Sequence, residues 1–458
     1  MSANSLWALT ATELNQLYRN GTTDPVQATR ACLERIEAVN PLLNAIVTID
    51  HDGAIDAATA SLARWRSGRP LSSLDGVPLT VKDNLFVGGL RATWGSKLFE
   101  SHIAPVDDIP IARLRAAGAI ILGKTNTPEL SLAGFTDNRL FGPTGNPWAP
   151  ELSSGGSSGG AASAVMAGMG PLAIVTDAGG STRRPAAHVG CIGLKPSLGR
   201  VPRRHGFAPL ANDFQSVGFL ARSSQDASAV FAIIADAPFG PAIGTRDTLT
   251  IGAFCLVGDR PVEPAIETGW KDAVRAFSDM GHKVDEIDAP FEADDIGELL
   301  LGLAASGVAR VVREHDGWRD RVTDAIAALA ERGLKTAAAD YVNTLDHVTA
   351  FRWQMADLFE QVDFLMTPTT PVSLWPKGEP YAKTIAGKTA KPRDSGIYTT
   401  FANVAGLAAI SLPMGLDGNG HPMGVQLVGP VNSEERLLKL AGDWERKSPW
   451  LTLSSFER

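Results

Sequence analysis

Cysteine and long apolar stretches are both scarce in this sequence of 458 residues. Its three cysteines, Cys32, Cys191 and Cys255, lie far apart and form no Cys-x-x-Cys pair. This spacing argues against a disulfide framework and against a zinc site. No uncharged apolar run reaches the roughly 18 residues that a membrane-spanning helix requires, and the N-terminus has no basic segment followed by an apolar one. We therefore expect a soluble protein of the reducing cytoplasm, with no membrane partner.

An excess of positive charge is missing as well. The 42 lysines and arginines are outnumbered by 50 aspartates and glutamates, which gives a formal net charge of −8. A general surface for nucleic acid needs the opposite balance, and the short basic runs 183–184 and 203–205 are too small to supply it. We therefore expect no nucleic-acid partner. What the chain does have is 44% apolar residues and 46 glycines, a composition typical of a globular enzyme rich in turns.

Helical and strand-like patterns alternate along the chain, which predicts an α/β protein with a sheet covered on its faces. The apolar spacing predicts helices over 11–39 (a hairpin), 54–66, 110–118, 161–170, 225–235, 263–280 and 433–446, with 294–361 mostly helical. Short apolar runs predict strands over 77–82, 119–122, 171–177, 249–257, 282–287, 409–413 and 423–429, and one that begins at Phe364. Neither a repeat nor a flexible linker divides the chain, so we expect a single domain.

Two serine-glycine runs in the middle of the chain are the clearest candidates for chemistry. The first run, 155–160, contains Ser157, and the second, 177–181, ends at Ser181. Glycine-lined turns of this kind expose a hydroxyl beside free backbone N–H groups. Upstream, a predicted buried strand places Lys82 at its C-terminal end, a common position for reactive side chains in α/β sheets.

The first run has three interpretations: a phosphate-binding loop, a flexible linker or a catalytic loop. A Walker loop requires a lysine after the glycines and a dinucleotide loop requires Gly-x-Gly-x-x-Gly, and the run matches neither. Its flanks, 146–148 and a helix of small residues, suggest that the run is packed. The pattern therefore favours a catalytic loop.

Ser181 is the better candidate for a nucleophile because several backbone N–H groups precede it in a tight turn. Such groups can form an oxyanion hole, here from Ala178, Gly179, Gly180 and Ser181. The hydroxyl also requires a base. No histidine lies in a motif that points to Ser181, and the nearest, His188, fits a packed loop residue. Lys82 is the alternative, provided that burial lowers the pKa of its amine enough for it to accept a proton.

Taken together, the motifs around these residues resemble those of the amidase signature family. The two serines, Ser157 and Ser181, are 24 positions apart, as in that family. The other matching motifs follow one another along nearly the whole chain: Gly76-Val-Pro-x-x-x-Lys82-Asp83, Gly123-Lys-Thr-Asn126, the run 155–160, Asp177-x-Gly-Gly-Ser-x-Arg183-x-Pro185, Gly193-Leu-Lys-Pro196 and Gly424-Val-Gln-Leu-Val-Gly429.

The resemblance implies one large α/β/α domain over 1–458, with a central mixed, twisted sheet covered by helices on both faces. Within it we expect a helical N-terminal part (1–70), a signature core (71–200) and a helical variable region (290–360) that shapes the substrate pocket. The segment 370–400 is a candidate for a lid.

The resemblance also implies roles for the site residues. Ser181 is expected as the nucleophile and Lys82 as the base. Ser157, which should follow a cis peptide bond with Gly156, is expected as the serine that bridges them. The supporting residues implied are Asp177 and Arg183, which brace the nucleophile loop, Ser158, which bonds within its loop, and Asp83, which supports Lys82. The implied reaction is hydrolysis of an amide C–N bond through an acyl-enzyme, with neither a metal nor a cofactor.

The chain departs from the usual pattern of the family in three places. Ser154 stands where a proline is common, and Val175 precedes Thr176 where a glycine is common. Beside Ser181, Thr182 and Arg184 replace more apolar residues. These departures leave the three implied catalytic residues untouched, so they concern the substrate and not the type of reaction.

Candidates for an acyl pocket are Leu132, Phe135 and Phe141, although each is equally compatible with a core position. The motifs indicate the type of reaction but do not identify the substrate or the partners. We expect a small, apolar or aryl amide and water as reactants, and a monomer or homodimer.

Several alternatives share the same residues. Carbamate (urethane) and ester hydrolysis by the same mechanism are possible, because these compounds present the same carbonyl to the serine. Another alternative is the A-type subunit of a glutamine-dependent amidotransferase, although no glutamine-recognition segment of that branch stands out in 290–360. The intact Lys82, Ser157 and Ser181 disfavour a catalytically silent binding protein.

Overall fold

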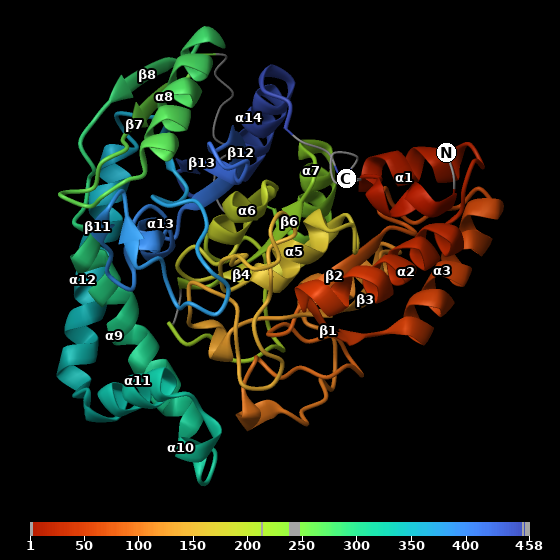
Figure 1. The fold of residues 1–458 in the computed structure, drawn as a ribbon, viewed down its shortest axis with the longest axis horizontal. Helices are drawn as coiled ribbons and strands as arrows, with labels where there is room; N and C mark the ends of the chain where they lie inside the picture. The colour runs from red at the N-terminus through yellow and green to blue at the C-terminus, as the bar shows by residue number, and fades with distance from the viewer. Residues whose placement is uncertain (1–2, 212–213, 238–247, 451–452, 454–458) are drawn as a thin grey trace.

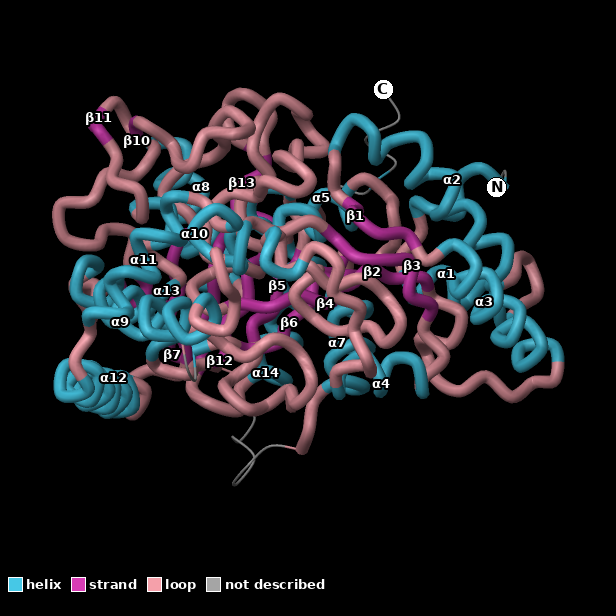
Figure 2. Tube along the Cα trace, turned by 90° about the horizontal axis from the view of Figure 1, so that it is seen from below, coloured by secondary structure: helices cyan, strands magenta, loops and turns pink. Residues whose placement is uncertain are grey.

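A mixed sheet of eleven strands runs through the residues that the computed structural model describes, 3–211, 214–237, 248–450 and 453. Figure 1 shows β1–β3 toward one end of the molecule and β7 and β8 toward the other, and Figure 2 shows the sheet from below. The strands lie in the order β1-β3-β2-β4-β6-β5-β12-β13-β9-β7-β8. Their bounds are β1 (Ile46–Ile49), β2 (Pro78–Lys82), β3 (Ile120–Thr125), β4 (Leu172–Asp177), β5 (Ile192–Lys195), β6 (Ser216–Ala221), β7 (Thr250–Ala253), β8 (Lys283–Glu286), β9 (Phe364–Pro368), β12 (Ala408–Leu416) and β13 (Pro422–Gly429). The neighbours β3, β2 and β4 are parallel, as are β9, β7 and β8, and the pairings between these two groups are antiparallel. A separate short pair consists of β10 (Thr384–Ile385) and β11 (Lys388–Thr389).

Helices flank this sheet. Their bounds are α1 (Ala11–Arg19), α2 (Pro25–Leu43), α3 (His51–Arg66), α4 (Ile109–Ala116), α5 (Gly159–Met166), α6 (Arg183–Val189), α7 (Ser224–Ile234), α8 (Pro264–Asp279), α9 (Ala293–Val312), α10 (Trp318–Arg321), α11 (Asp324–Lys335), α12 (Ala338–Leu358), α13 (Thr400–Val404) and α14 (Glu434–Lys447). The predicted hairpin over 11–39 forms α1 and α2, and α2 begins as its sequence implies. Asp24 accepts a hydrogen bond from the N–H of Gln27, and Pro25 occupies the first turn. Figure 1 shows α1–α3 at one end of the molecule and α9–α12 at the other.

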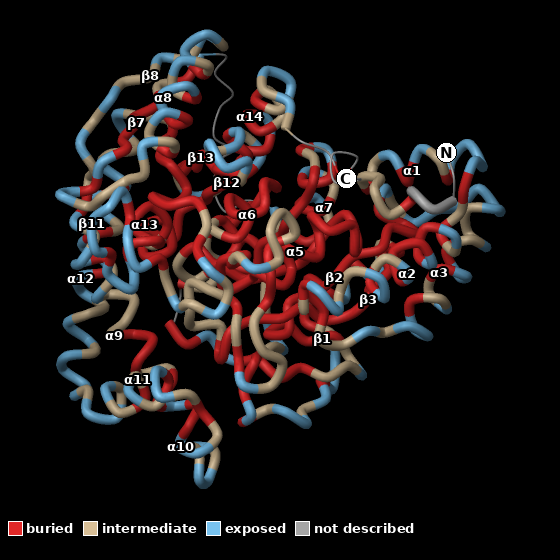
Figure 3. The backbone as a smooth tube through the Cα atoms, viewed as in Figure 1, coloured by how far each residue is buried: buried red, intermediate tan, exposed pale blue. Residues whose placement is uncertain are grey.

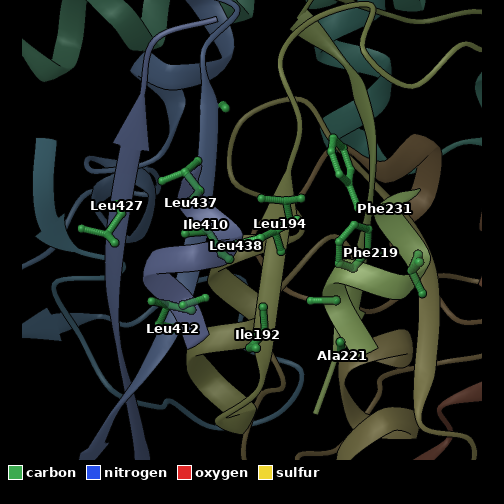
Figure 4. Close-up of a cluster of buried hydrophobic side chains, with 14 of the residues drawn as sticks. Ile192, Leu194, Phe219, Ala221, Phe231, Ile410, Leu412, Leu427, Leu437 and Leu438 are labelled. Atoms are coloured by element: carbon green, nitrogen blue, oxygen red, sulfur yellow. The ribbon is translucent and has the colours of Figure 1, made fainter. Parts of the chain in front are cut away.

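The central strands of the sheet are buried, as Figure 3 shows, whereas the edge strand β8 is partly exposed. Successive side chains of a strand point to opposite faces. In β4, Leu172 and Ile174 belong to a hydrophobic cluster that includes α7, α8 and α14, whereas Ala173 and Val175 pack with α5 and α6. Figure 4 shows part of the first cluster, where side chains of α7 and α14 meet those of β5, β6, β12 and β13. This arrangement confirms the predicted α/β domain with a mixed sheet covered by helices on both faces.

Among the elements that the prediction missed are three strands of the main sheet, β1, β5 and β6, and the helix α6. The strands β1 and β5 have four residues each, and apolar runs this short give an ambiguous signal. In β6, a β-carbon on Gly218 would lie 2.2 Å from the carbonyl oxygen of Leu194, so the packing requires glycine at this position. Glycine is uncommon within strands, and it therefore made β6 difficult to predict from the sequence. The helix α6 has seven residues and a proline, Pro185, which a helix tolerates in its first turn.

The described residues contain neither a membrane-spanning helix nor a cluster of metal ligands. None of the helices in these residues combines the length and the apolar character needed to cross a membrane. Likewise, no three or more histidine, cysteine, aspartate or glutamate side chains of the described part come together as metal ligands would. The three cysteines are free and buried.

Candidate active site

Lys82 lies at the end of β2, where the fold brings it to the first serine-glycine run. Its Nζ is 2.7 Å from Ser157 Oγ and 2.9 Å from Ser158 Oγ, and its side chain is fully buried. Strands β2 and β4 are parallel neighbours, so their C-terminal ends meet at one edge of the sheet. β4 ends at Asp177, the start of the second run. Parallel pairing therefore places the lysine and the Ser181 loop at the same edge, and the hydrogen bonds of Lys82 show that the Ser157 loop lies there as well.

The surroundings of Lys82 favour its neutral amine. Burial lowers the pKa of Lys82 well below its ordinary value; Asp177 opposes this shift, whereas the charges of Arg184 and Arg203 add to it. A neutral amine has one lone pair and two N–H bonds. It can thus accept a proton from one hydroxyl while it donates a hydrogen bond to another, as a general base requires.

Close packing fixes the run that carries Ser157. Gly155 has a φ of 75°, and a β-carbon on Gly156 would lie 2.6 Å from the backbone nitrogen and oxygen of Phe135. The peptide bond between Gly156 and Ser157 is cis, as the resemblance implied. The hydroxyl of Thr127 donates to the carbonyl of Ser157 over 3.0 Å. These contacts hold the Ser157 hydroxyl toward Lys82.

Asp177 shapes the second turn from within. Its carboxylate accepts hydrogen bonds from the N–H of Gly180 at 2.6 Å and of Thr182 at 2.9 Å, which wraps the chain around Ser181. The N–H of Ser158 donates to the carbonyl of Ser181 over 3.2 Å, so the two serine loops are joined directly. Ser181 is buried except for a small exposed fraction of 7%, and that fraction faces a cavity.

The position of Gly180 corrects one part of the predicted oxyanion hole. Its N–H is directed to Asp177 Oδ1 and is not free to bind a substrate oxygen. The hydrogen bonds of the described residues include none donated by the N–H groups of Ala178, Gly179 or Ser181. These three remain as candidate donors.

A buried ion pair supports the nucleophile turn. Arg183 Nε and Nη2 donate to the two carboxylate oxygens of Asp177 at 3.1 and 2.9 Å, and both side chains are fully buried. Burial alone would raise the pKa of Asp177, but the charge and the hydrogen bonds of Arg183 outweigh it and hold the pKa well below its ordinary range. Asp177 and Arg183 therefore form a buried ion pair inside the fold and not an exposed pair on its surface.

Two polar residues that sequence reasoning missed complete this network. Asn403 accepts from Arg183 Nη2 at 2.5 Å and donates to Asp177, and Gln426 accepts from Arg183 Nη1 at 2.7 Å. They lie more than 200 residues after Arg183 in the sequence. Gln426 belongs to a matched motif, 424–429, which was the available signal, whereas Asn403 belongs to none of the motifs.

Breaking this pair should cost much stability. Replacing Arg183 by methionine leaves the Asp177 carboxylate buried without its cation, and we expect a loss of about 3–5 kcal/mol in the free energy of unfolding, measured by urea denaturation. Arg275→Met is the matched control, because it breaks an exposed pair with Asp272, and such pairs contribute about 0–1 kcal/mol. Equal losses in the two variants would contradict a structural role for the Arg183 pair.

The predicted support of Lys82 by Asp83 is wrong in its geometry. Strand β2 ends at Lys82, and Asp83 lies in the turn that follows it, where its carboxylate is bonded to other residues. Asp83 accepts hydrogen bonds from the backbone N–H and hydroxyl of Thr93, and it forms a buried ion pair with Lys124 at 3.4 Å. Among the described residues, Asp83 has no hydrogen bond or ion pair with the amine of Lys82. The hydroxyl of Ser158, which was expected to bond within its own loop, is instead hydrogen-bonded to the amine of Lys82.

The cavity at Ser181 has a volume of about 420 Å³, within the range of small-molecule sites. Two of the predicted pocket residues, Leu132 and Phe135, line it. Phe141 is not among the lining residues; its ring lies 5.1 Å below the guanidinium of Arg91. Residues of α9 and of the segment 380–397 supply much of the remaining wall, including Ile296, Leu300, Tyr381 and Ile397. The wall also carries charged side chains, which the sequence did not reveal.

His188 is packed away from the cavity. Its ring makes an edge contact with Trp375 at 5.1 Å, and a β-carbon on Gly155 would lie 2.5 Å from its Nδ1. Burial lowers the pKa of His188 to about 3, so the ring is neutral at neutral pH. The ring is not part of the cavity wall that Ser181 lines, and Lys82 remains the candidate base.

Comparisons with known proteins agree with this geometry. The family model described as Amidase matches residues 27–438. The A-type subunit of the glutamyl-tRNA(Gln) amidotransferase of Geotalea daltonii is 31% identical over 97% of this chain and 98% of its own, and that of Acidothermus cellulolyticus is 34% identical over 95% and 94%. Among solved structures, a bacterial aryl acylamidase of the amidase signature family aligns with a TM-score of 0.88 at 26% identity over 98% of this chain and 97% of its own. A 6-aminohexanoate cyclic dimer hydrolase aligns with a TM-score of 0.85 at 26% identity over 97% and 98%. The chain therefore belongs to the amidase signature family.

Proposed function

We propose that this chain is a serine amidohydrolase that cleaves the C–N bond of a small amide through an acyl-enzyme on Ser181. One observation carries the proposal: a buried lysine with a lowered pKa lies 2.7 Å from Ser157, in a loop that is bonded directly to the loop of Ser181 beside a cavity. A proton relay requires this combination of an amine, a bridging hydroxyl and a second hydroxyl that a substrate can reach.

In the proposed acylation step, Ser181 Oγ attacks the carbonyl carbon of the amide and loses its proton to Ser157 Oγ. Ser157 passes its own proton to the neutral amine of Lys82, which becomes an ammonium. The proton then returns by the same route to the nitrogen of the substrate, the C–N bond breaks, and the amine or ammonia leaves. Water, activated by the same relay, attacks the ester on Ser181 and releases the carboxylate.

The tetrahedral intermediate carries a negative oxygen that needs hydrogen-bond donors. We assign this task to the N–H groups of Ala178, Gly179 and Ser181, because the fourth group of the turn, that of Gly180, is bound to Asp177. One such donor typically contributes about 2.7–4 kcal/mol to stabilising the transition state. By bonding two N–H groups of the turn, the Asp177 carboxylate also keeps the remaining donors in place before substrate binds.

The labelling of Ser181 by a fluorophosphonate tests this proposal. The reagent reacts with serines that are activated as nucleophiles, so we expect one adduct, on the peptide that contains Ser181, identified by mass spectrometry after digestion. We expect the adduct to be absent in Ser181→Ala and greatly slowed in Lys82→Ala. Failure to find an adduct on Ser181 in the wild-type chain would exclude the hydrolase mechanism.

A second candidate function follows from the curated relatives. Several A-type subunits of glutamyl-tRNA(Gln) amidotransferase align with nearly the whole chain at 30–34% identity. On this alternative the same serine would release ammonia from glutamine within an assembly of several subunits. The two candidates differ in their requirement for partners. Steady hydrolysis of simple amides by the isolated chain supports an independent amidase, whereas glutaminase activity that appears only with the other amidotransferase subunits present supports the second candidate.

The type of bond is best settled by a substrate panel. We propose an amide with an apolar or aryl acyl part, which would contact Leu132 and Phe135 of the cavity wall. Matched aliphatic and aryl amides, carbamates and esters, assayed with wild type and with Ser181→Ala, separate amidase from urethanase and esterase activity. If kcat/KM is higher for carbamates than for amides with the same acyl or aryl group, the substrate should be assigned as a carbamate and not as an amide.

A further inference from the structure

The wall of the cavity contains a cation, Arg184, that forms no ion pair with the described residues. It belongs to one of the three departures from the usual family pattern, and none of the other departing residues is part of the wall. The side chain of Arg184 is half-buried and lines the same cavity as Ser181, which it follows by three residues in the chain. Burial lowers the pKa of Arg184 to about 10, which leaves the guanidinium charged at neutral pH.

Three glycines make room for this guanidinium. A β-carbon on Gly134 or on Gly180 would lie 2.9 Å from one of its nitrogens, and a β-carbon on Gly396 would lie 3.4 Å away. The hydrogen bonds that hold it are long: Nε donates to the carbonyl of Gly180 over 3.4 Å, and Nη1 to Ser395 Oγ over 3.5 Å. The side chain is therefore seated in the wall while much of its bonding capacity is unused.

The acidic groups near Arg184 are engaged elsewhere. Asp177, the carboxylate that acts on it most strongly, already has both oxygens bonded to Arg183. Of the three acidic residues in the cavity wall, Asp294 and Asp394 pair with Arg260, and Glu298 pairs with Arg332 at 2.7 Å. Among the described residues, no carboxylate lies within ion-pair distance of Arg184. A guanidinium that is partly withdrawn from water and unpaired attracts an anion from the cavity.

We propose that Arg184 binds a carboxylate of the substrate, so that the preferred amides are anionic: monoamides of dicarboxylic acids or N-acyl amino acids. This inference rests on the proposed amidase function, since it concerns the part of the substrate that does not react. The planar guanidinium can bind a carboxylate through two parallel hydrogen bonds, which also orients the amide. Leu132 and Leu300 of the same wall would contact the apolar chain between the two ends.

Two pairs of matched substrates test the preference. Glutaramate and pentanamide have the same chain length and differ in a terminal carboxylate against a methyl group; they place the charge on the acyl side. N-acetyl-β-alanine and N-propylacetamide place the same difference on the amine side. We expect wild type to favour the carboxylate in at least one pair, by about 10-fold or more in kcat/KM. Ratios near one in both pairs would overturn the proposal.

Variants of two arginines in the same wall assign the effect to one residue. In Arg184→Gln we expect the ratio of kcat/KM between the charged and the neutral substrate to fall by about 10- to 100-fold, as for the loss of a charged hydrogen-bond pair. Arg184→Lys should keep part of the ratio. Arg393→Gln tests the rival site, because Arg393 is another arginine of the wall for which the described residues provide no ion pair. Its side chain is exposed to water, so we expect its loss to change the ratio by less than about threefold. A fall of equal size in Arg393→Gln would contradict a specific role for Arg184.

Binding measurements separate failure of this inference from failure of the proposed function. In Ser181→Ala, calorimetry compares the affinity for glutaramate with that for pentanamide, and likewise for the second pair, without any turnover. A preference for the carboxylate that is lost in Ser181→Ala/Arg184→Gln supports the inference even if the wild-type chain hydrolyses none of the four compounds. Equal affinities for charged and neutral compounds overturn it even if Ser181 is labelled and active.

Discussion

Replacing Ser181 by alanine should lower kcat on any amide substrate by about 10⁴-fold or more, because the acyl-enzyme can no longer form. The loss of one hydroxyl should leave the fold intact. The turn is held by the Asp177 carboxylate and by the backbone bond from Ser158 to the Ser181 carbonyl, and neither contact uses the Ser181 side chain. We therefore expect an unchanged unfolding temperature and an unchanged affinity for substrate.

The matched control for this variant is Ser163→Ala. Ser163 is a fully buried serine of α5 whose hydroxyl donates to the carbonyl of Gly145 over 2.7 Å and takes no part in the proposed relay. We expect this change to leave kcat within about threefold and to cost about 1 kcal/mol of stability, the usual contribution of one hydrogen bond. Residual turnover above about one per cent in Ser181→Ala, in protein free of wild-type contamination, would show that another group is the nucleophile.

The sequence motifs indicated that Lys82 and the two serine loops lie together, as the structure shows them, and the reason is local. The turns around Ser157 and Ser181 depend on glycines at fixed positions, such as Gly155 with its positive φ and Gly156 against the Phe135 backbone. These requirements leave a motif that can be read without knowledge of the fold. The position of Lys82 was predictable for the same reason, because a short apolar run with one lysine at its end is typical of a buried strand. The structure brings the Lys82 amine to Ser157 as expected.

The contacts between distant segments were not predictable in the same way. Asn403 of α13 and Gln426 of β13 reach Arg183 at the start of α6 only in the folded chain, where β13 packs against α6. Asp83 follows Lys82 directly, and sequence proximity suggested a contact, but the carboxylate of Asp83 is bonded to Thr93 and Lys124 instead. The cavity wall combines α9, the residues near 132 and the segment 380–397, so its charges became visible only with the structure.

Replacing Lys82 by methionine should lower kcat/KM on amides by about 10³- to 10⁴-fold, near the upper end of what general acid–base catalysis contributes. Methionine keeps most of the volume of the buried side chain and removes the amine. An amide needs a proton on its leaving nitrogen, whereas the nitrophenolate of an activated ester leaves without one. The loss on a nitrophenyl ester with the same acyl group should thus be smaller by about tenfold or more. Equal losses on the two substrates would contradict the assignment of Lys82 as the proton carrier.

The pH dependence provides an independent test of the same residue. The base must be neutral, so kcat/KM of the wild type should rise with pH through the lowered pKa of Lys82 and then level off. This rising limb should disappear in Lys82→Met, although the residual activity is low. An identical limb in wild type and variant would assign the titration to another group.

Stability distinguishes the loss of a catalytic group from damage to the fold. Because the pKa of Lys82 is lowered in the folded state, the unfolded chain binds more protons between the folded pKa and the ordinary value of about 10.4. The buried amine therefore destabilises the fold at neutral pH, and this penalty shrinks as pH rises toward the ordinary value.

Lys82→Met should be at least as stable as wild type at about pH 7, with an advantage that decreases toward about pH 10. A variant that is more stable and nearly inactive would show that the fold retains a buried lysine at a cost in stability because the reaction needs its amine. A variant that is both inactive and much less stable would instead assign Lys82 a structural role.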